Sequence, residues 1–110
     1  MPENELHQPM FVGVLPVLQP GGHLPPDAHA QTVNLIANIF SLLAGNPSYR
    51  LVSVIVYVGN YKMAVTVLRH FQNAGLGGPV RRCLVKQMGP GLCVSAELTL
   101  HLHHNIRSKL

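Results

Sequence analysis

The stretch Arg50–Val58 has the sequence Arg-Leu-Val-Ser-Val-Ile-Val-Tyr-Val, the densest run of β-branched and aromatic residues in the chain. Such a run is typical of a β-strand, in which successive side chains point to opposite faces. Alternation gives two mainly apolar faces, one with Val52, Val54, Val56 and Val58 and the other with Leu51, Ser53, Ile55 and Tyr57. A strand that is apolar on both faces is usually buried on both, so we expect a central strand with further layers above and below it.

Two helical patterns flank this strand and could supply those layers. The first begins after Asp27, whose carboxylate can cap free backbone N–H groups, and it runs to about Ala44. The stop is the run Gly45-Asn46-Pro47, because glycine ends helices and a residue before proline is driven out of the helical region. Residues at three- and four-residue spacing form its apolar face: Leu35, Ile36, Ile39, Phe40 and Leu43.

The second helical pattern begins after Asn60, another capping residue, and runs to about Ala74, where Gly75 follows. Its middle is rich in β-branched residues, which lowers helix propensity. A strand over Met63–Leu68 is therefore the alternative for this segment.

Three further strands are predicted. Phe11–Leu18 contains Pro16, which cannot donate a ladder hydrogen bond, so we place this strand at a sheet edge. Val80–Met88 and Cys93–His104 are separated by a Gly-Pro-Gly turn at 89–91, which predicts a hairpin. The second of these strands alternates between apolar and polar residues, as in an antiparallel strand with one buried face.

The resulting order is strand, helix, strand, helix, strand, strand, which predicts an α+β fold with a mixed or antiparallel sheet and two helices. With 110 residues we expect a single domain over 9–104, a flexible amino terminus over 1–8 and a basic tail over 105–110. We expect the core to be led by Ile36, Phe40, Val54, Val56, Leu68 and Leu98.

The sequence also indicates the cellular compartment that we expect. No apolar run reaches the roughly 18 residues of a membrane-spanning helix, and the first residues lack the basic start and apolar stretch of a signal peptide. Cys83 and Cys93, without an export signal, are expected to be free thiols in a reducing compartment.

Charge is distributed unevenly along the chain. No acidic residue occurs from Ala28 to Ala96, whereas six basic residues accumulate there. These six are the candidate anion-binding residues: Arg50, Lys62, Arg69, Arg81, Arg82 and Lys86. A cationic surface of this kind favours lipid headgroups, nucleic acid or an acidic protein as partners. An ordinary solvated basic surface is the alternative.

Metal binding and catalysis find little support in the sequence. His101, His103 and His104 lie close together, and the first two could share an ion from one face of a strand, but no third ligand stands at a diagnostic spacing. A nucleophilic Cys83, with its pKa lowered by neighbouring arginines, would need a base such as His70. Nothing in the sequence places such a base beside it, so we expect no enzyme, metal, cofactor or small-molecule substrate.

The segment Phe40–Val58 resembles the core of rhabdovirus matrix proteins: a helix that ends at Gly-Asn, then an arginine, then a valine-rich strand. The edge strand at Phe11–Leu18 and the pair Arg81-Arg82 extend this likeness. The resemblance implies a viral structural protein that self-associates, binds ribonucleoprotein and the inner membrane surface, and resides in the host cytoplasm, at a membrane or in the virion.

The sequence also departs from that family. The lysine-rich amino-terminal tail and the budding motif of two prolines, any residue and tyrosine are missing, and Pro25-Pro26-Asp27-Ala28 is the nearest match to the motif. The alternative function is a small adaptor or regulatory protein that binds a single protein partner.

Overall fold

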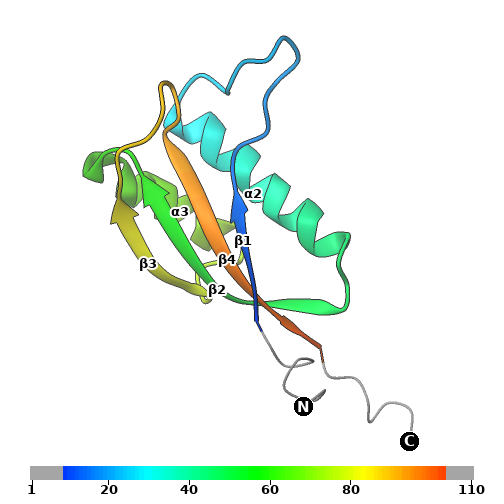
Figure 1. The fold of residues 1–110 in the computed structure, drawn as a ribbon. Helices are drawn as coiled ribbons and strands as arrows, with labels where there is room; N and C mark the ends of the chain where they lie inside the picture. Colours follow the sequence, from blue (N-terminus) through cyan, green and yellow to red (C-terminus); the bar gives the residue numbers. More distant parts are fainter. Residues whose placement is uncertain (1–8, 104–110) are drawn as a thin grey trace, which may run out of the picture.

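The computed structural model describes residues 9–103. The predictions made for 1–8, for His104 and for the tail at 105–110 lie outside the described residues. The elements follow the order predicted from the sequence, a mixed four-stranded sheet with two helices (Figure 1). In chain order they are β1 (Met10–Val14), α2 (Ala28–Ala44), β2 (Tyr49–Val58), the short 3-10 helix η1 (Tyr61–Met63), α3 (Ala64–Asn73), β3 (Val80–Val85) and β4 (Val94–Leu102).

The helix starts are those that the capping residues predict. The Asp27 carboxylate accepts a hydrogen bond from the Ala30 N–H at 2.8 Å, and the Asn60 side-chain oxygen accepts one from the Lys62 N–H at 2.8 Å. Each side chain thereby satisfies a backbone donor that the first turn leaves free. The strand alternative for Met63–Leu68 is wrong, because η1 and α3 cover that segment.

The predicted hairpin between the last two strands is wrong. The sheet order is β1-β4-β2-β3, so β4 lies between β1 and β2 and is antiparallel to both. β3 lies at the outer edge and runs parallel to β2, because α3 crosses between them and returns the chain to the same end of the sheet. The turn at 89–91 belongs to a longer connection that carries the chain past the end of β2.

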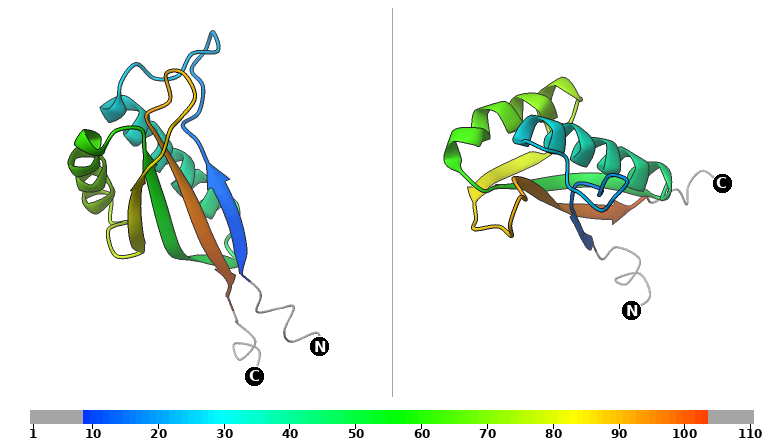
Figure 2. Two further views of the ribbon diagram at one scale, coloured as in Figure 1. Left: turned by 60° about the vertical axis from the view of Figure 1, so that its left-hand side comes forward. Right: turned by 90° about the horizontal axis from the view of Figure 1, so that it is seen from above.

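The prediction that β2 is buried on both faces is also wrong, because α2 and α3 lie on the same side of the sheet (Figure 2). Val54, Val56 and Val58 point toward the helices and are fully buried. The opposite side, which we call the open face, is covered by neither helix, and Ile55 and Tyr57 are half-buried there.

Most of the predicted core is present. Ile36, Val54, Val56 and Leu98 are buried in one cluster with Leu35, Ile39 and Phe71. Phe40 is 43% exposed, because it follows the buried Ile39 and is turned about 100° away from it around the helix axis. Leu68 is half-buried and lines a pocket described below.

Gln31 ties three segments together from inside the protein. This fully buried side chain donates from Nε2 to the carbonyl oxygens of Pro25, at 3.0 Å, and Gly91, at 2.6 Å, and its Oε1 accepts from the Cys93 N–H at 2.8 Å. The loop before α2 and the connection before β4 are therefore both fixed to α2. A buried amide is stable only when such partners are present.

We expect Gln31→Leu to destabilise the fold by roughly 3 kcal/mol, since each buried polar group left without a partner costs about 1–3 kcal/mol. The measurement is urea unfolding followed by circular dichroism. Gln87→Leu is the matched control, because Gln87 is exposed, and we expect it to change stability little. Equal stability of the two variants would show that the Gln31 hydrogen bonds do not hold the loops.

Candidate functional site

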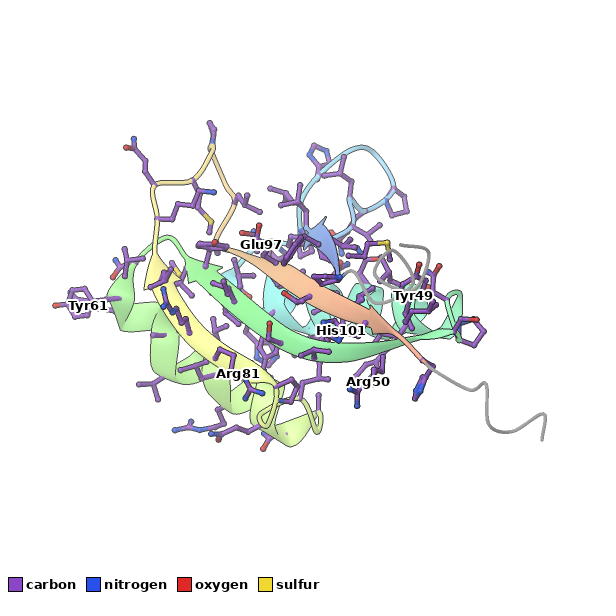
Figure 3. The ribbon with its side chains drawn as sticks, turned by 60° about the horizontal axis from the view of Figure 1, so that its bottom comes forward. Tyr49, Arg50, Tyr61, Arg81, Glu97 and His101 are labelled. Carbon is purple, nitrogen blue, oxygen red and sulfur yellow. The ribbon has the colours of Figure 1, made fainter. Side chains whose placement is uncertain are left out.

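The six basic residues predicted to bind anions are spread over several elements of the fold. All six are exposed: Arg50 in β2, Lys62 in η1, Arg69 in α3, Arg81 and Arg82 in β3, and Lys86 just beyond β3. Figure 3 shows Arg81 at the start of β3 and Arg50 farther along the sheet beside His101. Arg81 and Arg82 alone among the six line the same pocket. Anion binding by any of the six stays a prediction.

Arg81 lies at an irregularity in the sheet. Val54 pairs with Val80, but the next residue, Ile55, pairs with Arg82, so Arg81 is an extra residue in β3. Such bulges are uncommon in parallel pairs, and they re-aim a side chain relative to the regular alternation. The bulge therefore takes the Arg81 side chain out of the regular alternation, whereas Arg82 pairs with Ile55 of the open face.

The glycine-rich loop before β3 orients the Arg81 guanidinium. Arg81 Nη1 donates a hydrogen bond to the Gly78 carbonyl oxygen at 2.9 Å. The loop itself packs closely on α3, because a Cβ at Gly77 would lie 3.0 Å from Gln72 Cγ. A guanidinium has five N–H donors, so the contact with Gly78 leaves most of them able to bind an anion.

The pocket between α3 and β3, which we call the arginine pocket, has a volume of about 280 Å³. Its lining comprises Leu68, Phe71, Gln72, Gly77, Val80, Arg81, Arg82 and Cys83. One wall is apolar and the other carries the Arg81 side chain, and no carboxylate occurs among these lining residues. Arg82 also borders the pocket, but it pairs with Ile55 of the open face, and its charge acts there on the Tyr57 hydroxyl. The pocket therefore matches a small anion with an apolar part.

Cys83 lies in this pocket, but its chemistry differs from the expectation. Burial raises the pKa of the Cys83 thiol, whereas the sequence suggested that Arg81 and Arg82 would lower it. Cys83 is half-buried, lies opposite Val56 in the ladder between β2 and β3, and packs against the core, where a thiolate would lose solvation. Cys83 is thus poorly suited to act as a nucleophile at neutral pH.

We expect iodoacetamide to alkylate Cys83 several-fold more slowly in the native protein than in urea, because a raised pKa lowers the thiolate fraction and burial limits access. The rate is measured by mass spectrometry in a Cys93→Ser background, which leaves Cys83 as the single thiol. An alkylation rate in the native protein equal to or above the rate in urea would show that the arginines lower the pKa of Cys83 more than burial raises it.

A second hollow, of about 330 Å³, lies beside β1 and is lined in part by Tyr57, Lys86 and Glu97. The Tyr57 hydroxyl donates to Glu97 Oε1 at 3.3 Å, and Lys86 Nζ lies 4.9 Å from the centre of the Tyr57 ring. Burial and, to a lesser degree, the Glu97 charge raise the pKa of the Tyr57 hydroxyl. The Tyr57, Glu97 and Lys86 side chains interact with one another, so Lys86 is less available to bind an anion than Arg81 in the arginine pocket.

His101 and His103 do not both lie in a strand, as the sequence pattern suggested. His101 lies opposite Arg50 in the ladder between β2 and β4, and His103 is exposed beyond the end of β4. Within residues 9–103, no three His, Cys, Asp or Glu side chains converge on a common point. His29 and His70, which the sequence did not single out as a pair, are in direct contact, with His70 Nε2 and His29 Nδ1 2.8 Å apart.

Comparison with known proteins shows which fold this is. A scan against protein-family models and a search of curated proteins found no significant match. Solved structures match with 16–23% identity, and they include members of the YjgF/YER057c/UK114 family. The chain has the fold of these proteins.

Three of the matches illustrate the likeness. Rv2704 from Mycobacterium tuberculosis, a YjgF/YER057c/UK114 family member, is 21% identical with a TM-score of 0.63, covering 83% of this chain and 75% of its own. A candidate translation initiation inhibitor from Vibrio vulnificus is 19% identical with a TM-score of 0.70, covering 86% and 81%. A candidate endoribonuclease from Thermotoga maritima is 18% identical with a TM-score of 0.69, covering 87% and 80%.

These findings overturn the resemblance to rhabdovirus matrix proteins, because the matching structures are YjgF-type proteins. The expectation of a viral matrix protein in the virion is wrong, and the alternative adaptor function gains no support. No evidence favours a lipid surface or a ribonucleoprotein as partner. The pattern in Phe40–Val58 is a helix, a turn and a buried strand, which many α+β folds share. In the described residues, no helix has the length and hydropathy needed to cross a bilayer.

Proposed function

We propose that the protein binds a small organic carboxylate in the arginine pocket. The observation that carries the proposal is the Arg81 guanidinium at one apolar-walled pocket whose lining contains no acid. The expectation of no small-molecule ligand came from the sequence alone, and this proposal replaces it.

The chemistry of the lining favours a carboxylate. A planar guanidinium forms two parallel hydrogen bonds to a carboxylate, and each is a charge-assisted bond. Leu68, Phe71 and Val80 give the rest of the ligand an apolar surface. Because the volume is about 280 Å³, at the small end of ligand pockets, the ligand is of the size of an amino acid or 2-oxo acid with a short side chain.

Binding without turnover follows from the same lining. The lining residues with titratable side chains are Arg81, Arg82 and Cys83, and burial raises the pKa of the Cys83 thiol. None of these is a general base at neutral pH. Two of the structural matches are described as a candidate translation initiation inhibitor and a candidate endoribonuclease, so RNA cleavage is the catalytic activity to test against this proposal.

The experiment compares butanoate with butanamide, which has nearly the same shape but no charge. Titration followed by backbone amide NMR should show saturable shifts at Gly77, Arg81 and Cys83 with butanoate and none with butanamide. Inorganic phosphate is the third probe, because a site that binds any anion should respond to it and a site specific for carboxylates should not. Equal shifts with the two organic probes, or shifts away from this pocket, would overturn the proposal. Loss of butanoate or cleavage of added RNA would overturn binding without turnover.

Self-association through the open face is the second part of the proposal. In one row of the sheet, Ile55 pairs with Glu97 on one side and Arg82 on the other. The row therefore places an acid and a base on either side of an apolar centre, so a copy related by a two-fold axis that runs along the strands would meet opposite charges. Light scattering should give a mass above 12.0 kDa, and Ile55→Asp should lower it to that of one chain while the fold is retained. A single-chain mass for the unaltered protein would refute this part.

A further inference from the structure

His29 and His70 bring two imidazole nitrogens from different helices to one point. His29 lies in the first turn of α2 and His70 in the last turn of α3. His70 Nε2 and His29 Nδ1 are 2.8 Å apart, the ring centroids are 4.6 Å apart, and the ring planes are inclined by 60°. At this distance one nitrogen donates a proton to the lone pair of the other, so both nitrogens point into the same space.

We infer that this pair binds one divalent transition-metal ion, with zinc as the ion to test. Imidazole nitrogen is a preferred ligand of zinc, copper and nickel. The ion would take the place of the shared proton: the donating ring loses that proton to solvent and takes one up on its other nitrogen, so both rings stay neutral and bind the ion through the two lone pairs that face each other. Magnesium and calcium prefer oxygen ligands and should not bind.

The geometry requires only a small adjustment. Two nitrogens that bind tetrahedral zinc at about 2.0–2.1 Å lie roughly 3.3 Å apart, so the rings must separate by about 0.5 Å. His29 is exposed and His70 is half-buried, so one ring can move into solvent. Water reaches the site and can fill the remaining coordination positions.

The surrounding charges neither strongly favour nor strongly oppose an ion. The last turn of α3 carries the negative end of a helix dipole, and the first turn of α2 carries the positive end. The Asp27 carboxylate caps α2 two residues before His29 and offsets part of that positive end. The two ligands are 41 residues apart in sequence, so the site exists only in the folded chain and bound metal stabilises the fold.

Metal binding at this pair would also affect the arginine pocket. Phe71 and Gln72, which line the pocket, directly follow His70 in α3. An ion held between the helices would fix the turn of α3 that carries this wall. The inference does not depend on the proposed ligand, because the pair lies outside the pocket lining.

The test uses the whole chain without a polyhistidine tag, at about pH 7.5. Calorimetric titration with Zn²⁺ should show one equivalent bound, and Zn²⁺ but not Mg²⁺ should raise the melting temperature. His29→Asn and His70→Asn should each abolish both effects. The double variant His101→Asn with His103→Asn is the matched control and should bind as the unaltered protein does.

A second measurement works even if a variant fails to fold. Zinc should shift the imidazole NMR signals of His29 and His70 in the unaltered protein and leave those of His101 and His103 in place. The inference is overturned if Zn²⁺ does not bind, if both single variants still bind it, if the control loses it, or if other histidine signals shift instead.

Discussion

A Val56→Asp substitution is expected to abolish cooperative folding. Val56 is fully buried in the middle of β2, between Ala96 of β4 and Cys83 of β3. An aspartate there would bury a charge without a partner at a cost of several kcal/mol, against a typical total stability of about 5–15 kcal/mol. The measurement is thermal unfolding followed by circular dichroism.

Ser53→Asp is the control on the same strand. Ser53 is half-buried on the open face opposite Thr99, so within a single chain the new carboxylate can remain in contact with water, and the substitution would affect self-association and not the folding of the chain. We expect this variant to melt cooperatively. If the Val56→Asp protein is soluble and melts as sharply as the Ser53→Asp protein, the assignment of β2 as the strand on which the core is built is contradicted.

The second large effect is expected at Arg81. Arg81→Gln should weaken butanoate binding about 10- to 100-fold, because a hydrogen bond to a charged group contributes about 1.5–3 kcal/mol. Arg81→Lys should bind butanoate more tightly than Arg81→Gln and more weakly than the unaltered protein. Lysine keeps the charge but lacks the planar fork that binds both carboxylate oxygens. The measurement is calorimetric titration at fixed ionic strength.

Arg69→Gln provides the matched loss of one positive charge. Arg69 is exposed on α3 and does not line the arginine pocket. We expect its loss to change affinity less than twofold, because Arg69 does not line the pocket and the field of an exposed charge is weakened by water and salt. Equal losses for the Arg69 and Arg81 variants would mean that net charge, and not the pocket, controls binding.

Local sequence signals predicted the elements but not their arrangement. Capping by Asp27 and Asn60 and the run Arg50–Val58 predicted both helices and the β2 strand, because these signals act over a few residues. The parallel pairing of β2 with β3 depends on the crossing of α3, which no local pattern encodes. The turn at 89–91 therefore predicted a hairpin that does not form.

The two-sided burial of β2 was mispredicted for a related reason. Ile55 and Tyr57 are apolar enough for a buried face, yet both helices pack on the other side. A face of this composition is explained if another copy of the chain covers it, as we propose. Sequence periodicity cannot distinguish burial within one chain from burial between chains.

Part of the candidate site was predictable. Arg81-Arg82 stood out because no acid lies nearby in sequence. The bulge at Arg81 and the apolar wall of Leu68 and Phe71 depend on tertiary contacts, so the pocket could not be predicted. The contact of His29 with His70 joins two helix ends 41 residues apart, and no spacing rule relates them.

The most direct test of the central claim is a crystal structure of the protein with bound butanoate. The account predicts a carboxylate within hydrogen-bond distance of the Arg81 guanidinium, with the alkyl chain against Leu68 and Phe71 and the Gly78 contact retained. A carboxylate bound elsewhere, or an arginine pocket that stays empty at a butanoate concentration well above the measured dissociation constant, would contradict it.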